Sequence, residues 1–99
     1  MQHSANPSKR DFDELLQQAL EKTRTYETEL PGFQPLASVR RQLELMSQYV
    51  KAERTPPAEA QDSVNVGLLA VREFQDTDPQ YSGWLIDLDY WFKRWTLLR

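Results

Sequence analysis

The chain has 99 residues, of which 39% are hydrophobic and 27% charged, and its formal net charge is −3. This length and composition are typical of one small globular domain and exclude a chain that is disordered throughout. Because the chain has no cysteine, disulfides, thiolate catalysis and cysteine-ligated zinc are excluded as well.

Residues 1–7 are predicted to form a flexible leader, and residues 8–99 a single helical domain. The leader has no apolar segment of the kind found in secretory signals. No stretch approaches the roughly 18 consecutive apolar residues of a membrane span, so we expect no membrane contact. The only histidine, His3, lies in the leader, where no packed surroundings would orient it for catalysis or metal binding.

Two helices are predicted in the first half of the chain. Ser8 and Asp11 have the spacing of a capping box, which marks the start of the first helix. The proline- and glycine-containing segment 30–35 ends that helix. The second helix is predicted over residues 36–53 because apolar residues recur there every three or four positions, at Leu36, Val39, Leu43, Met46 and Val50.

Two further helices are predicted after the break at residues 55–57. One runs from about Ala58 to Phe74, and its expected buried positions are Ala60, Val64, Gly67, Leu68, Val71 and Phe74. A glycine inside a helix costs about 1 kcal/mol relative to alanine, so Gly67 predicts the close approach of a neighbouring helix. The other helix runs from Pro79 to about Thr96, with Asp78 as its N-cap. The predicted fold class is therefore all-α, a small four-helix bundle with short proline-containing connections.

The last predicted helix has two distinct faces. Its broad aromatic face contains Tyr81, Trp84, Leu85, Leu88, Trp91, Phe92 and Trp95, while Gly83, Asp87, Tyr90 and Arg94 lie on the other side. The tryptophans are either a core stripe or anchors for a partner, and both interpretations remain open. Asp87 and Tyr90, on the outward face, are predicted to bind a partner.

Negative charge is concentrated in the second half of the chain. Residues 58–89 contain seven acidic residues and a single basic one, Arg72. Such a field repels phosphate backbones and attracts basic protein surfaces. Nucleic-acid binding is therefore disfavoured, and a protein partner with a basic surface is expected.

The sequence contains none of the common catalytic motifs. It has no glycine-rich phosphate loop, no Gly-x-Ser-x-Gly and no His-Glu-x-x-His, so neither an enzyme nor a bound cofactor is expected. Asp76 and Asp78 could share Mg²⁺ or Mn²⁺ in a metal-dependent hydrolase, but such an ion would need further oxygen ligands. Helix capping and solvated charge are the simpler interpretation of this pair.

A resemblance to a known family is centred on residues 67–82, which read GLLAVREFQDTDPQYS. This segment, with its A-V-x-E-F-x-x-T-D-P core, the Pro31-Gly32-Phe33 turn and the helical Arg41-Gln42-Leu43, is similar to type VI secretion immunity proteins. The greatest similarity is to those that protect Pseudomonas from its NAD(P)⁺ glycohydrolase effector, and it covers about residues 26–90. The resemblance implies a small acidic helical protein, made in the cytoplasm, that binds a toxin domain and blocks its active site.

The sequence therefore predicts a non-enzymatic inhibitor of a secreted toxin. Its partner-binding residues are predicted to be Glu73, Asp76 and Asp78, which lie within the similar segment, together with Asp87 and Tyr90. The alternative is a non-catalytic helical adaptor that forms a homodimer through the apolar seam of residues 36–50 or through the tryptophans.

Overall fold

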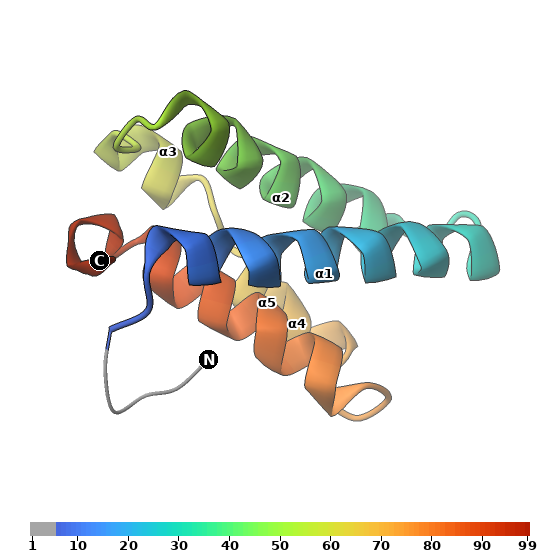
Figure 1. The fold of residues 1–99 in the computed structure, drawn as a ribbon. Coiled ribbons are helices and arrows are strands. Elements are labelled where there is room, and N and C mark those ends of the chain that lie inside the picture. Colours follow the sequence, from blue (N-terminus) through green and yellow to red (C-terminus); the bar gives the residue numbers. More distant parts are fainter. Residues whose placement is uncertain (1–5) are drawn as a thin grey trace.

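The computed structural model describes residues 6–99, which fold into a bundle of α-helices without strands in that range. The helices are α1 (Lys9–Glu29), α2 (Gln34–Ala52), α3 (Ala58–Asp62), α4 (Val66–Glu73) and α5 (Pro79–Phe92), followed by the short 3₁₀ helix η1 (Trp95–Leu97). In Figure 1, α1 crosses the front of the molecule, α2 lies above it, and α5 and α4 lie behind and below it. The prediction of a small all-α bundle is confirmed. His3 lies outside the described residues.

The start of α1 has the predicted capping box. The Ser8 hydroxyl accepts the backbone N–H of Asp11 at 3.0 Å, and the Asp11 carboxylate accepts the backbone N–H of Ser8 at 3.0 Å. These two bonds satisfy donors that a helix N-terminus leaves without partners. The chain then turns between α1 and α2 through Gly32, whose φ of +85° favours a residue without a Cβ.

The prediction of one continuous helix from Ala58 to Phe74 is wrong. The chain leaves the helix at Ser63 and re-enters it at Val66, which separates α3 from α4. At the break, the backbone N–H of Asn65 donates to the Gln42 side chain of α2 at 2.8 Å, and Gln42 donates back to the Asn65 side chain at 2.6 Å. The Ser63 hydroxyl also donates to the Ala60 carbonyl at 2.7 Å, a local side-chain bond that competes with continuation of the helix.

The break also changes which residues of α4 face the core. The predicted burial of Leu68 and Val71 is wrong, since their exposed fractions are 56% and 49%. Phe74 is buried as predicted, and it shares one helix face with the buried Val66 and Ala70, since the three residues are four positions apart. A continuous helix could not have buried both Val64 and Val66, which would lie about 200° apart around its axis.

The last helix ends earlier than its predicted end at Thr96. α5 stops at Phe92, and the chain turns into η1, which places the Trp95 ring 5.5 Å from Phe12 and 6.0 Å from Phe92. Backbone hydrogen bonds join the two ends of the described chain after η1. The backbone N–H of Arg99 donates to Pro7 at 3.0 Å, and that of Lys9 donates to Arg99 at 3.0 Å.

One apolar core lies between α1, α2, α4 and α5. Its largest fully buried side chains include Phe12, Tyr81 and Phe92. The Tyr81 hydroxyl lies 2.6 Å from that of Thr23, which donates to the Ala19 carbonyl, so these buried polar groups have partners. Trp91 and Trp95 are also buried, as are four of the five seam residues of α2, with Val50 partly buried. The seam and these two tryptophans are therefore used inside the fold and are not free to form a dimer.

Candidate protein interface on α4 and α5

Asp78 holds the corner between α4 and α5 in place. Its carboxylate accepts the backbone N–H of Tyr81 at 3.0 Å, which is the predicted N-cap of α5. It also pairs with Lys22 of α1 at 2.6 Å and accepts the hydroxyl of Tyr26. Only 14% of the Asp78 side chain is exposed, so this carboxylate chiefly joins α5 to α1.

The contacts of Asp78 shift the ionisation of two groups in the corner. Partial burial on its own would raise the pKa of Asp78, but hydrogen bonds from Lys22, Tyr26 and the Tyr81 backbone outweigh it and lower that pKa below its ordinary value. The hydrogen bond to Asp78, assisted by desolvation, raises the pKa of Tyr26 to about 12. Asp78 is therefore a carboxylate, and Tyr26 a neutral phenol, across the physiological range.

The two other acids of the corner face outward. Asp76 is exposed in the turn, and Glu73 is half-buried at the end of α4. Within residues 6–99, neither of these carboxylates forms an ion pair. Of the three predicted corner residues, Glu73 and Asp76 therefore present charge to solvent, and Asp78 positions the turn that carries them.

Asp87 and Tyr90 lie on the outward face of α5, as predicted. Tyr90 is 45% exposed, and the Arg94 guanidinium lies 3.8 Å from the centre of its ring. Arg94 also donates to the Tyr90 carbonyl at 3.1 Å, so the ring and the cation hold each other in place. Asp87 is partly buried.

The five predicted residues do not form one cluster. Asp78 is the N-cap of α5, and Tyr90 lies twelve residues later within that helix. Twelve residues correspond to roughly 18 Å along the helix axis. The residues instead mark the two ends of the antiparallel α4–α5 pair, with the acidic corner at the turn. Leu68, Val71 and Ile86 lie on these two helices between those ends.

An apolar groove runs between α4 and α5. It encloses about 550 Å³ and is lined by Asn65, Gly67, Leu68, Val71, Ile86, Asp89, Tyr90, Lys93 and Arg94. Four apolar or aromatic side chains in it are well exposed, namely Leu68, Val71, Ile86 and Tyr90. We use "the α4–α5 groove" for this surface. Exposed apolar side chains gathered in this way are typical of a binding surface.

Gly67 lets the two helices that form the groove approach closely. Its N–H donates to the Asp89 carboxylate of α5 at 2.8 Å, and the other oxygen of Asp89 pairs with Lys93 at 2.9 Å. A Cβ at Gly67 would lie 3.0 Å from that carboxylate. The predicted close approach of a neighbouring helix is confirmed.

The sequence did carry a signal for the groove. Ile86 does not belong to the aromatic stripe of α5, and it lies four residues before Tyr90, which places both on one outward face. An apolar residue outside the buried stripe indicates an apolar side chain on the solvent-facing side of the helix. Leu68 and Val71 could not be found in this way, because the assumption of a continuous helix assigned them to the core.

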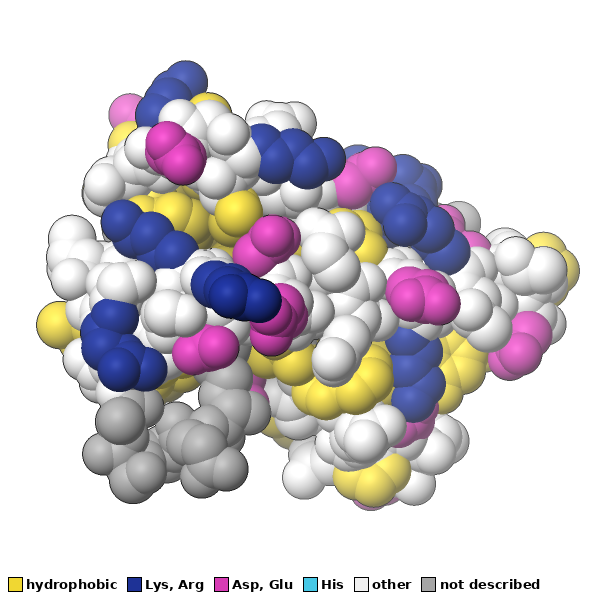
Figure 2. All heavy atoms as spheres, in the orientation of Figure 1, with side chains coloured by type: hydrophobic (Ala, Val, Ile, Leu, Met, Phe, Trp, Pro, Cys, Tyr) yellow, Lys and Arg dark blue, Asp and Glu magenta, His cyan; other side chains and the backbone are white. Residues whose placement is uncertain are grey.

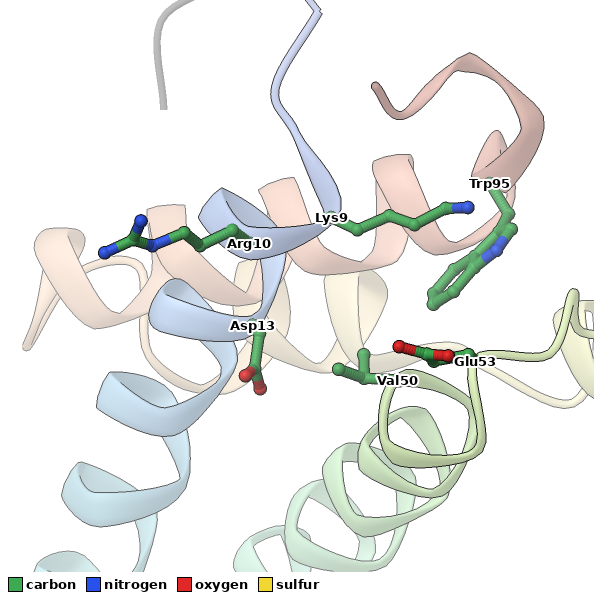
Figure 3. A pocket seen from close by; sticks show the side chains of 6 residues that line it. All are labelled: Lys9, Arg10, Asp13, Val50, Glu53 and Trp95. Atoms are coloured by element: carbon green, nitrogen blue, oxygen red, sulfur yellow. The ribbon is translucent and has the colours of Figure 1, made fainter.

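A second pocket lies where the start of α1, the end of α2 and η1 meet. It encloses about 460 Å³ and is lined by Lys9, Arg10, Asp13, Val50, Glu53 and Trp95. Figure 3 shows the Asp13 and Glu53 carboxylates at its border, while the guanidinium of Arg10 points away. This lining does not indicate a particular class of ligand.

The described residues offer no site of three or more side chains that could hold a metal ion. Asp78 is also committed to Lys22 rather than to an ion shared with Asp76. Within residues 6–99, no helix combines the length and apolar character that a bilayer span requires.

Comparison with known proteins decides the family. The family model for Tsi6 matches residues 11–94, which is most of the chain. This chain belongs to the Tsi6 family. It is therefore a type VI secretion immunity protein, as the resemblance predicted, and membership of the Tsi6 family implies a cognate toxin protein as its partner. Neither the curated proteins nor the solved structures gave a significant match.

Membership of the Tsi6 family also bears on catalysis and on the matched residues. No catalytic activity is expected of an immunity protein. The matched range includes α2, α3, α4 and α5, and thus both the acidic corner and the α4–α5 groove.

Proposed function

We propose that this protein neutralises an NAD(P)⁺-hydrolysing type VI secretion toxin by binding its toxin domain and covering the active site. The match to the Tsi6 family over residues 11–94 is the observation that carries this proposal. The protein acts by binding alone and needs no cofactor. Because the toxin consumes a cytoplasmic nucleotide, the immunity protein works in the cytoplasm.

The toxin-binding surface is the α4–α5 pair with its acidic corner. Glu73, Asp76 and Asp87 contact the basic cleft in which the toxin holds its anionic substrate, and Tyr90 anchors the edge of the contact. Tyrosine is suited to this role because it supplies a large contact area with few rotatable bonds. Asp78 contributes by fixing the turn, with its own charge neutralised by Lys22.

Charge has a definite role in this mechanism. Complementary potentials accelerate the encounter of two proteins, and fully desolvated contacts then slow their separation. Glu73 and Asp76 have no cationic partner within residues 6–99, so their charge is available to a basic partner. The acids of α1 and α2 are instead interspersed with bases, as Figure 2 shows for that face.

The test is a titration of purified protein into the NAD⁺-hydrolysis assay of the cognate toxin. We expect stoichiometric inhibition. The double variant Glu73→Lys with Asp76→Lys should weaken inhibition by about 100-fold, the effect of losing an interfacial hot spot. The matched control is Glu14→Lys with Glu21→Lys, which makes the same charge change on exposed positions of α1.

Two outcomes would contradict the proposal. Undiminished NAD⁺ hydrolysis at excess protein would show that the toxin is of another kind. Equal losses from the corner variant and the α1 control would show that net charge, rather than the acidic corner, drives binding.

A further inference from the structure

The Arg94 guanidinium lies at one end of the α4–α5 groove with part of its hydrogen-bonding capacity unused. It is 3.8 Å from the centre of the Tyr90 ring, and its Nη1 donates to the Tyr90 carbonyl at 3.1 Å. Within the described residues, Arg94 forms no ion pair. A guanidinium carries five N–H donors in a planar fork that matches a carboxylate. Stacking on Tyr90 therefore fixes this fork while leaving donors free for an acidic group from outside.

The acidic residue of the groove does not neutralise Arg94. That residue is Asp89, which accepts the Gly67 N–H at 2.8 Å and pairs with Lys93 at 2.9 Å. The charges of Asp89 and Lys93 thus compensate each other. Arg94 is the groove-lining cation whose charge is left uncompensated by the described part of the chain.

A second cation lies beside the apolar residues. Arg72 is exposed and follows Leu68 by four residues, so both share one face of α4. Arg72 likewise has no ion pair within residues 6–99. Glu73 lies about 200° around α4 from Val71, which lines the groove. The groove face is therefore apolar with uncompensated positive charge, and the acid at the end of α4 lies on another face.

The apolar residues lie at a defined distance from Arg94. Leu68 is 56% exposed, Val71 49% and Ile86 39%, and all three line the groove. Ile86 precedes Arg94 by eight residues, which is roughly 12 Å along α5. A helix laid along the groove covers this distance in about two turns. It can thus place a carboxylate at Arg94 and an apolar side chain beside Ile86 when these lie seven or eight residues apart.

We propose that the α4–α5 groove binds an amphipathic helix of the toxin domain that carries an Asp or Glu about two turns from its apolar side chains. The carboxylate accepts the free donors of Arg94, and the apolar side chains pack on Leu68, Val71 and Ile86, as amphipathic helices do in apolar grooves. That the partner is the toxin rests on the proposed function. A second copy of this chain fits less well, because its own groove would bring the same positive charge.

This helix and the basic cleft of the toxin are separate contacts. Glu73 faces away from the groove and meets the cleft, whereas Arg94 meets the acidic helix. The two contacts carry opposite charges, so substitutions in each can be measured independently.

Calorimetry of the purified chain with its cognate toxin tests the groove. Arg94→Glu should weaken binding by roughly 30-fold or more, the loss expected when a buried charge loses its partner. Arg94→Lys keeps the charge without the planar fork, so its loss should be smaller. Ile86→Asp should also weaken binding. The matched control is Arg24→Glu, the same charge change on the exposed surface of α1, which should bind like the wild type. Circular dichroism establishes that each variant remains helical.

A photo-crosslinking residue in place of Ile86 identifies what fills the groove. Mass spectrometry of the product should give a toxin peptide with an acidic residue about seven positions from the linked residue. Replacing that acid in the toxin by lysine should weaken binding to the wild type and restore binding to Arg94→Glu. A general effect of charge or folding would not be reversed in this way.

Three results would overturn the inference. They are wild-type affinity in both Arg94→Glu and Ile86→Asp, a linked toxin peptide without acidic residues, and a crosslink that joins two copies of this chain. Inhibition of NAD⁺ hydrolysis is measured separately. A toxin that binds with the expected losses but is not inhibited would support the groove contact and contradict the proposed function.

Discussion

The helical pairs α1–α2 and α4–α5 both pack into the common core but present different surfaces. On the α1–α2 pair, charges of opposite sign neutralise one another, with Arg40 bound to Glu27 at 2.9 Å and to Glu44 at 3.1 Å. Figure 2 shows acidic and basic side chains interspersed over that face. On the α4–α5 pair, the exposed side chains include three aliphatic residues, Leu68, Val71 and Ile86.

This difference distinguishes the residues that stabilise the fold from those that are available to bind a partner. Both pairs bury one face in the common core, so burial alone does not distinguish them. The paired charges of α1–α2 suit a surface that remains in water, where each exposed ion pair stabilises little. On α4–α5, Leu68, Val71 and Ile86 become stabilising contacts only when another protein removes them from water. The comparison thus predicts which substitutions affect stability and which affect binding.

The largest effect should come from a buried leucine of α1 compared with an exposed leucine of α4. Leu16 is fully buried, so Leu16→Ala should lower the free energy of unfolding by about 2–5 kcal/mol through lost contacts and a cavity. Leu68 is 56% exposed, so Leu68→Ala should change that free energy by less than about 0.5 kcal/mol. Urea denaturation of both variants measures the two values. A large loss for Leu68→Ala would mean that the groove belongs to the core.

Asp78 gives the next largest effect, because it joins the two halves of the molecule. Asp78→Ala removes the cap of α5 together with the bonds from Lys22 and Tyr26, and should cost about 2 kcal/mol. Asp78→Asn keeps a capping side chain but loses the charge, so it should cost less. Chemical denaturation should therefore rank the wild type first, Asp78→Asn second and Asp78→Ala last. Equal stability of all three would contradict the anchoring role of this residue.

The contribution of Asp78 should depend on pH. Its pKa is lowered in the folded state, so its charge stabilises the fold above the unfolded-state pKa, and this contribution is lost as the pH falls through the folded-state pKa. The stability difference between the wild type and Asp78→Asn should stay constant from neutral pH to about pH 5, and it should shrink below about pH 4. Unfolding curves of both proteins at several pH values measure this difference. A difference that grows as the pH falls would contradict the lowered pKa.

Local signals in the sequence predicted much of the fold. The capping box at Ser8, the seam of α2 and the Asp78–Pro79 start of α5 each depend on residues a few positions apart, so no tertiary information is needed to find them. The break between α3 and α4 depends instead on Gln42, more than twenty residues away in sequence. No local pattern contains that contact.

Because no local pattern predicts the contact between Gln42 and Asn65, the site was predicted only in part. A helix that continues from α3 into α4 places Leu68 and Val71 in the core. The sequence therefore did not predict the groove that these two residues line. Asp78 was predicted both to cap α5 and to bind a partner. The sequence showed its cap, but its contacts with Lys22 and Tyr26 of α1 come only from the tertiary fold.

The smallest effects should come from two glycines that differ in their surroundings. Gly67→Ala places a Cβ 3.0 Å from the Asp89 carboxylate, which the Gly67 N–H and Lys93 both hold in place. A hydrogen bond to a carboxylate contributes about 1.5–3 kcal/mol, and the helix propensity of alanine offsets up to about 1 kcal/mol of its loss, so we expect a net loss of about 1 kcal/mol. A Cβ at Gly83 of α5 would meet nothing within 4 Å, so Gly83→Ala should gain about 0.5–1 kcal/mol from helix propensity. Thermal unfolding of the two variants should move in opposite directions, and a gain for Gly67→Ala would mean that the approach of α4 to α5 is loose enough to admit a side chain.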